Sequence, residues 1–195
     1  MSEYIMLGKI PKSPEERKAL IGKRVEQEEH FSDLGMTQVQ GRLIEFVMSE
    51  KGYSEKDLEL NKVYNVVLSD GITENSFNVK ADIVVRLNNT SLFIVKCVMS
   101  SMESWERHSA AFCRVVEPNQ VPYAVVTDGE DARMIDAVSG KLLSLGLDSI
   151  PSKDEALVLL KETVFCPFSR ERCEKEKRIL HAFDAITCST ASGKT

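Results

Sequence analysis

Three cysteines and one histidine near the C-terminal end have the chemistry to bind zinc or an iron–sulfur cluster, namely Cys166, Cys173, Cys188 and His181. Closed zinc sites normally draw two ligands from a short Cys-x-x-Cys segment, which brings both sulfurs to one side of a turn. The cysteines here are much further apart in the sequence. We therefore predict that they do not form a metal site.

The three histidines, His30, His108 and His181, have the chemistry of a general base. They are far apart in the sequence, and none has an acid or a cysteine at the spacing of a catalytic triad. Nucleophilic catalysis is therefore not supported. His108 lies among apolar residues, and we predict that it is a hydrogen-bonded histidine of the core or its boundary. Cys97 and Cys113 are predicted to be small core residues.

Two segments contain groups that bind phosphate in other proteins. The chain ends in Ala191-Ser192-Gly193-Lys194-Thr195, which is similar to the end of a phosphate-binding loop. Cys188 stands where that loop has its first glycine, so we treat the match as coincidence. The second segment is a basic stretch in which glutamates are interleaved with Arg170, Arg172, Lys175, Lys177 and Arg178. Such alternation is typical of a solvated helix face.

The composition limits the class of protein. Of the 195 residues, 43% are hydrophobic, which is enough for the core of one domain. The net charge of −5 argues against a dedicated nucleic-acid clamp. No apolar run reaches the roughly 20 residues of a membrane-spanning helix, and the N-terminal residues lack the apolar core of a secretory signal. With an odd number of cysteines, five, we expect a cytoplasmic protein that does not bind membranes.

The elements that position these side chains follow from the spacing of apolar residues. Ser13-Pro14-Glu15-Glu16 predicts the start of a helix that runs to about His30, within an N-terminal helical extension at residues 1–35. A second capping pattern begins at Thr37, and apolar residues recur at helical spacing until Gly52. This second helix is predicted to pack on the core.

A change of period predicts a sheet after the second helix. Three strands rich in Val, Ile and Phe are joined as hairpins, at residues 63–68, 77–87 and 92–98. A helix is predicted at 102–116, and further strands at 121–126, 132–137 and 141–145. A helix between two strands of one sheet implies a crossover, so the predicted class is α/β with a mixed β-sheet flanked by helices.

The C-terminal part of the chain is predicted to be helical. A capping pattern at Ser152 begins a helix that ends at about Glu162, and a second helix is expected from Ser169 to Phe183. We predict a single domain over residues 1–195. It consists of the extension at 1–35, a core at 36–145, C-terminal helices within 146–188 and a disordered tail at 189–195.

The order of these elements and several segments resemble a known family. The segments are Glu50-Lys51-Gly52-Tyr53, Lys80-Ala81-Asp82-Ile83-Val84-Val85-Arg86-Leu87, Leu92-Phe93-Ile94-Val95-Lys96-Cys97-Val98, Val121-Pro122-Tyr123 and Thr127-Asp128-Gly129. Together, over about residues 36–145, they resemble the N-terminal endonuclease domain of type I restriction enzyme R subunits, in the PD-(D/E)xK nuclease superfamily. The resemblance implies a restriction-endonuclease-like fold and DNA cleavage in the restriction of foreign DNA.

The resemblance also implies a Mg²⁺ site built from an aspartate on one strand and an acid-x-lysine on the next, often with a glutamate on the first helix. Mg²⁺ takes oxygen ligands and activates the water that hydrolyses a phosphodiester, while the lysine offsets negative charge. The aspartate is present as Asp82, but the acid position falls on Lys96 and the lysine position on Val98. On the first helix, the expected positions hold Met36, Thr37 and Gln38.

The lysine at position 96 decides the expected chemistry. An ammonium facing Asp82 would occupy the place of the metal, and two unit charges about 4 Å apart attract each other by roughly 4 kcal/mol at an effective dielectric constant near 20. We therefore predict an ion pair between Lys96 and Asp82 and a catalytically impaired site. The protein would then act as a nucleic-acid-binding or interaction module, with DNA or with protein partners of a restriction system.

Two other functions remain open. The first is an active Mg²⁺-dependent DNA endonuclease with migrated residues, in which Lys80 supplies the lysine, Glu103 or Glu45 supplies an acid, and Asp82 and Glu103 bind the metal. The second is a regulatory protein-interaction domain without a nucleic-acid role, which the net charge of −5 favours.

Overall fold

The chain divides into two units, Met1–Gly35 and Met36–Thr195. The structure, a computed structural model, describes residues 35, 37–69 and 73–191. The helical extension predicted for the N-terminal residues lies outside the described part of the chain, except for Gly35. The last four residues of the predicted tail, 192–195, also lie outside it. All that follows concerns the second unit.

The described residues form one six-stranded sheet in the order β1-β2-β3-β4-β5-β6. The strands are β1 Leu58–Ser69, β2 Glu74–Leu87, β3 Thr90–Cys97, β4 Tyr123–Thr127, β5 Ala132–Asp136 and β6 Lys141–Leu145. Only β3 and β4 run parallel; the other neighbours are antiparallel. The predicted α/β class, with a mixed sheet flanked by helices, is confirmed.

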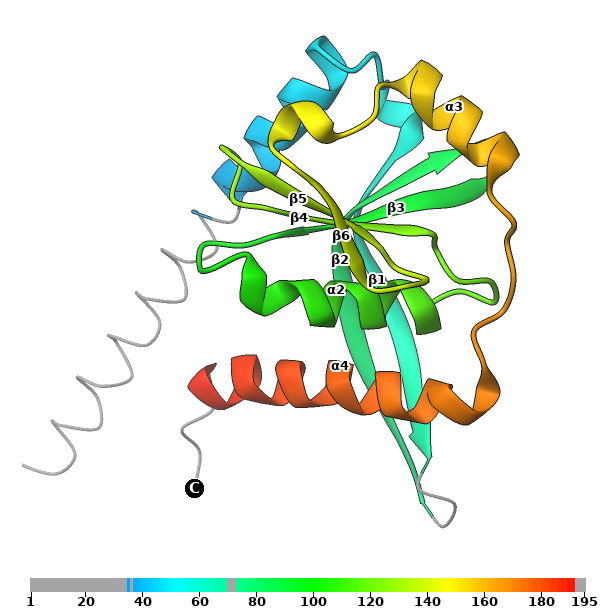
Figure 1. Cartoon of the computed structure of the whole chain (residues 1–195). Helices are drawn as coiled ribbons and strands as arrows, with labels where there is room; N and C mark the ends of the chain where they lie inside the picture. The colour runs from blue at the N-terminus through cyan, green and yellow to red at the C-terminus, as the bar shows by residue number, and fades with distance from the viewer. Residues whose placement is uncertain (1–34, 36, 70–72, 192–195) are drawn as a thin grey trace, which may run out of the picture. The chain divides into compact units, whose positions relative to one another are not determined.

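Helices lie on both faces of this sheet (Figure 1). The helix at residues 37–49 and α3 (Lys153–Glu162) cover one face, and α2 (Glu103–Val115) and α4 (Arg170–Ala191) lie on the other. Short 3-10 helices occur at Glu55–Asp57 and Leu147–Ser149. The element order is the one that the resemblance implies, because α2 connects the only parallel pair of strands.

Local sequence signals set the ends of two helices. The 37–49 helix stops where Gly52 adopts a φ of +74°, and the amide of Tyr53 donates to the carbonyl of Val47. This is a glycine C-cap, which a residue with a Cβ adopts only with strain. At the start of α3, the Ser152 and Glu155 side chains form the predicted capping box.

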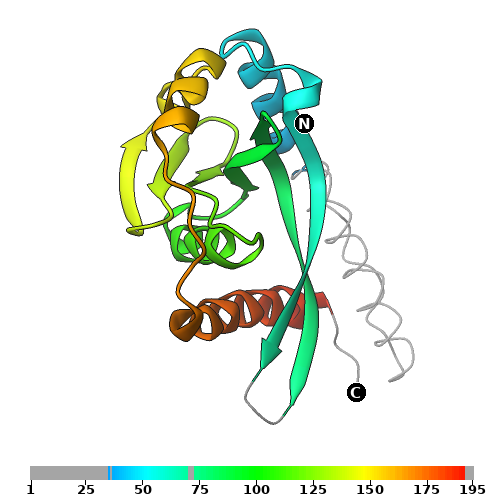
Figure 2. The same ribbon diagram turned by 90° about the vertical axis from the view of Figure 1, so that its right-hand side faces the viewer.

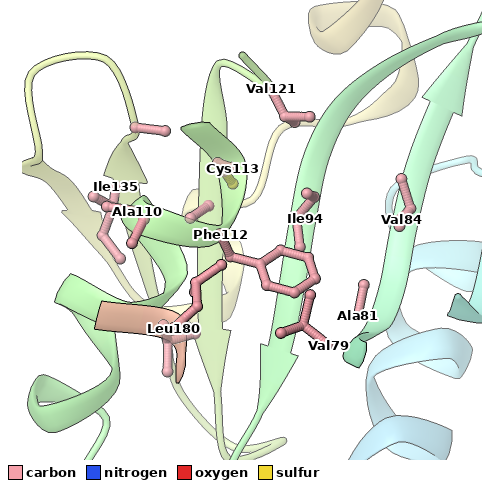
Figure 3. Close-up of a cluster of buried hydrophobic side chains, with 14 of the residues drawn as sticks. Val79, Ala81, Val84, Ile94, Ala110, Phe112, Cys113, Val121, Ile135 and Leu180 are labelled. Carbon is pink, nitrogen blue, oxygen red and sulfur yellow. The ribbon is translucent and has the colours of Figure 1, made fainter. Parts of the chain in front are cut away.

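Alternation along the strands produces two cores. On β3, Phe93 and Val95 pack with Leu43 and Val47 of the 37–49 helix, whereas Ile94 packs towards α2. The core on the α2 face gathers residues from five strands, β1 to β5, and from the helices α2 and α4; Figure 3 shows part of it. They include Val79, Ala81, Val84, Ile94, Ala110, Phe112, Cys113, Val121, Ile135 and Leu180. Cys97 and Cys113 are buried, as predicted.

The C-terminal helix forms a second layer over α2. Glu176 on α4 accepts hydrogen bonds from Arg107 (2.6 Å) and Arg114 (3.1 Å) of α2, and its side chain is only 5% exposed. The prediction that this basic stretch forms a solvated helix face is therefore wrong at Glu176. The pattern of alternating charges does not reveal that two arginines lie on the neighbouring helix. The helix also extends beyond the predicted end at Phe183, to Ala191.

The hairpin of β1 and β2 extends past the rest of the sheet alongside α4 (Figure 2). Contacts fix this arrangement: the amide of Ser69 donates to Glu174 at 3.0 Å, and the ring of Phe77 meets that of His181 edge-on at 5.1 Å. Residues 74–81 of β2 pair with β1, and the pairing with β3 begins at Ile83. None of the described helices is both long enough and apolar enough to cross a membrane.

Replacing Glu176 by alanine should lower the free energy of unfolding by about 3 kcal/mol, because it leaves the buried guanidinium of Arg114 without its carboxylate. Urea denaturation followed by circular dichroism measures the change. Glu171→Ala, at an exposed position of the same helix, is the matched control and should change stability by less than about 0.5 kcal/mol. Equal stability of the two variants would show that the buried pair does not hold α4 on α2.

Candidate functional site

Asp82 lies where β2 and β3 separate, directly before the pairing of Ile83 with Val95. Asp82 is buried, with 4% of its surface exposed. One carboxylate oxygen accepts a hydrogen bond from the backbone amide of Cys97 at 2.8 Å and lies 3.2 Å from Nζ of Lys96. The ion pair predicted from the sequence is therefore present, and a backbone donor from the same strand strengthens it.

The ammonium of Lys96 is held from two sides. It faces Asp82 on one side, and it lies 5.5 Å from the centroid of the Trp105 ring, at the start of α2, on the other. An ammonium at this distance from an indole face is attracted by the ring quadrupole. The side chain of Lys96 is 20% exposed. It therefore occupies the space beside Asp82 and does not extend into solvent.

Val98 has no means of replacing the lysine of the family motif. It is 3% exposed and belongs to the core beneath α2, and its backbone amide donates to Thr127 at 2.8 Å. An uncharged, buried side chain neither orients water nor stabilises a phosphoryl anion. A lysine introduced at this position would be buried among apolar residues, so the motif is not restored by a single exchange there.

Glu103, the acid that we considered as a second metal ligand, is engaged elsewhere. It lies at the start of α2, pairs with Arg133 of β5 at 3.0 Å and accepts a hydrogen bond from the Ser101 hydroxyl. This hydroxyl and the nearby guanidinium hold the pKa of Glu103 below its usual range. Arg133 also pairs with Glu106. Among the described residues, no three His, Cys, Asp or Glu side chains gather at a possible metal site.

Of the two remaining candidates, Lys80 lies beside this site, whereas Glu45 has no described contact with it. Lys80 is exposed on β2 and lines the same small cavity as Lys96. Glu45 is exposed on the 37–49 helix, and no described contact joins it to Asp82. Of the residues singled out from the sequence, the structure thus brings together Asp82, Lys96 and Lys80.

The residue by which the first helix reaches the site is Gln40, which sequence reasoning missed. Its side-chain amide donates to the backbone carbonyl of Asp82 at 2.7 Å. The family resemblance implies an acid at positions 36–38, which are occupied here by Met36, Thr37 and Gln38. Gln40 follows the buried Val39 and is itself half-buried, so a polar residue bordering the apolar stripe was the available signal. A neutral amide here adds no negative charge for a cation.

Aromatic rings support the lysine from the side of α2. Trp105 and His108 meet edge-on at 5.1 Å, and both contact the ring of Phe183 on α4, at 5.6 and 5.1 Å. His108 is buried, as predicted, but neither of its ring nitrogens has a hydrogen-bond partner. Burial, with a smaller contribution from the charge of Lys96, lowers the pKa of His108 to about 4. The imidazole is therefore neutral at pH 7.

No described contact joins Cys166 or Cys173 to this site. Cys166 is exposed, Cys173 is partly buried on α4, and both are free thiols. His181 packs against Phe77. The side chain of Cys188 lies outside the described part of the structure.

The chain matches the model of a known protein family. The family model described as "Type I restriction enzyme R protein N terminus" matches residues 38–151. No curated protein and no solved structure is significantly similar to the chain. The matched range contains β1 to β6 and α2, and it ends before α3 and α4.

Exchange of His108 should reduce the sensitivity of the fold to acid. The unfolded chain protonates this histidine near pH 6.5, whereas the folded chain does so only near pH 4. Falling pH therefore favours unfolding throughout this window, by about 3 kcal/mol at its lower end. His108→Phe, which keeps a ring in the aromatic cluster, should lose most of this slope in urea denaturations at pH 7, 6, 5 and 4. A variant with the slope of the wild type would contradict the burial of a neutral imidazole.

Proposed function

Because the chain belongs to the family of type I restriction enzyme R protein N termini, we propose that it is a PD-(D/E)xK nuclease-like domain that binds nucleic acid without metal-dependent cleavage. The observation that carries this proposal is the ion pair between Lys96 and Asp82. An ammonium 3.2 Å from the carboxylate opposes the binding of a divalent cation there, because the two positive charges repel each other. The structural role of the aspartate is kept while its catalytic role is lost.

The surroundings of the pair support the same proposal. Hydrolysis of a phosphodiester needs a metal to activate water and a cation to stabilise the anion that forms. Val98 is buried in the core, and Gln40 supplies an amide at the helix contact. The family motif has an acid where this chain has Lys96, a lysine where it has Val98, and often a glutamate on the first helix. All three groups are missing from these places.

An active Mg²⁺-dependent endonuclease with migrated residues is the alternative. It would require Mg²⁺ bound by Asp82 and Glu103, Lys80 in the place of the motif lysine, and displacement of Lys96. The ion pair between Glu103 and Arg133 opposes this arrangement, since the carboxylate would have to exchange one cation for another. The exposed Lys80 beside the site is the feature that favours it.

The partner that we propose is DNA, bound alone or with protein components of a restriction system, in the cytoplasm. The lysines at positions 80 and 96 offer positive charge near Asp82, while the chain as a whole carries a net charge of −5. Binding should therefore be local and weak, and it should weaken further as salt rises. A protein partner could add the affinity that the acidic chain lacks.

Cleavage and retention assays test the proposal together. Purified protein with plasmid DNA and Mg²⁺, or titrated Mn²⁺, should give no more nicking than Asp82→Ala, because neither protein binds the metal at this site. Gel retention of a short duplex should decrease between about 50 and 200 mM salt. Metal-dependent cleavage that Asp82→Ala abolishes would establish the active nuclease instead. Absence of any salt-dependent retention would favour the regulatory interaction domain.

Restoring an acid at position 96 should restore metal binding. Lys96→Glu removes the ammonium and places a second carboxylate beside Asp82, which matches the oxygen ligands that Mn²⁺ and Mg²⁺ prefer. Calorimetry should show Mn²⁺ affinity at least about tenfold above that of the wild type. Lys96→Gln, which removes the charge without adding a carboxylate, is the matched control and should gain less. An unchanged affinity in a folded Lys96→Glu protein would rule out this position as the metal site.

A further inference from the structure

A small cavity lies between β2, β3 and α2, next to the Asp82–Lys96 pair. Its volume is about 10 Å³. The polar residues that line it are Lys80, Lys96, His108 and Ser109, and the rest of its wall is formed by apolar residues of the two strands and by Phe112. The cavity therefore combines side chains from three elements that are distant in the sequence.

Two of these polar side chains are buried without a hydrogen-bond partner. His108 is 4% exposed and Ser109 is 2% exposed. Both ring nitrogens of the histidine lack a hydrogen-bond partner in the structure. The hydroxyl oxygen of the serine also lacks one. Buried polar groups are nearly always paired, because an unmet donor or acceptor costs about 1–3 kcal/mol. Three such atoms beside one cavity indicate that a polar ligand belongs there.

The charges of the wall define the sign of that ligand. Two lysines line the cavity and no acid does; Asp82 offsets only one of the two positive charges. Burial, and to a smaller extent the charge of Lys96, lowers the pKa of His108, so the imidazole beside the cavity adds no negative or positive charge of its own at pH 7. Such a wall repels cations. It can donate hydrogen bonds from both ammonium groups, the serine hydroxyl and one nitrogen of the neutral imidazole.

The size of the cavity defines the number of atoms that enter. A volume of roughly 10–15 Å³ accommodates one water molecule, and therefore one oxygen atom. A complete phosphate or carboxylate group does not fit. One oxygen of a phosphate can enter while its phosphorus stays at the mouth, where the exposed Lys80 reaches the remaining oxygens.

We propose that this cavity, formed by Lys80, Lys96, His108 and Ser109, binds one anionic oxygen of a phosphate group without a metal ion. The inference rests on the proposed function, since the phosphate source in that function is a nucleic-acid backbone or its terminal phosphate. It adds a ligand site and a role for the lysine that replaced the acid: Lys96 neutralises Asp82 and contributes positive charge to the phosphate. Because these positive charges come from the protein, the phosphate binds without a metal ion.

The single tryptophan of the chain makes the site observable. Trp105 lies against both Lys96 and His108, so a ligand in the cavity should alter its fluorescence. Inorganic phosphate is titrated at constant ionic strength with EDTA present, followed by 5′-phosphorylated and unphosphorylated single-stranded oligonucleotides. Phosphate should give a saturable change. A larger response to the phosphorylated oligonucleotide would identify a terminal phosphate as the source, and equal responses would identify the backbone.

Variants assign the response to the cavity. Ser109→Ala and Lys80→Gln each remove one donor and should weaken phosphate binding by about tenfold. Both should fold, because the serine hydroxyl makes no described bond and Lys80 is exposed. Lys161→Gln, at an exposed position of α3 on the opposite face of the sheet, is the matched control and should bind as the wild type does. Equal loss in all three variants would overturn the site in favour of general electrostatic attraction.

The outcomes separate this site from the proposed function. Phosphate binding that depends on Ser109, without retention of any oligonucleotide, would support the site and overturn the nucleic-acid role. Retention of oligonucleotides that leaves Trp105 fluorescence unchanged and does not depend on Ser109 would support that role and overturn the site. Absence of both would overturn both.

Discussion

A carboxylate whose charge is already offset by an ammonium at close range attracts a further cation less strongly, because the two positive charges repel each other. In this chain the cation beside Asp82 is the ammonium of Lys96, at 3.2 Å, so the charge that a nuclease would supply as a metal ion is supplied by the polypeptide. The amide of Cys97 donates to the same carboxylate, and Gln40 donates to the carbonyl of Asp82. These contacts join β2, β3 and the 37–49 helix at the point where the two strands separate. Asp82 therefore has a structural role in this fold.

The position of the ammonium depends on packing that begins well outside the motif. Lys96 rests against Trp105, and Trp105 contacts Phe183 of α4. The buried carboxylate of Glu176 holds α4 on α2 through two arginines. Helix α4 lies beyond the residues that the family model matches. A segment that follows the family region in the sequence thus contributes to the site, since it supports the rings on which the lysine lies.

The sequence predicted the fold better than it predicted the site. Strands with alternating Val and Ile, the capping box at Ser152 and the glycine C-cap at Gly52 are local signals, and the structure contains the elements that they predict. The ion pair of Lys96 with Asp82 was also predicted, because the family resemblance places Lys96 at the position of the acid that faces this aspartate. Gln40 and Glu176 were missed, because their partners lie on elements that are distant in the sequence and become neighbours only in the tertiary structure. The cavity beside His108 depends on three elements and has no local signal at all.

Diffraction from crystals soaked in Mn²⁺, recorded at the manganese absorption edge, tests most directly whether the ammonium takes the place of a metal. We predict no anomalous density within coordination distance of the Asp82 carboxylate and a Lys96 amine that still contacts it. A manganese ion bound by Asp82 and a second carboxylate such as Glu103, with the amine of Lys96 turned away, would contradict a metal-free site.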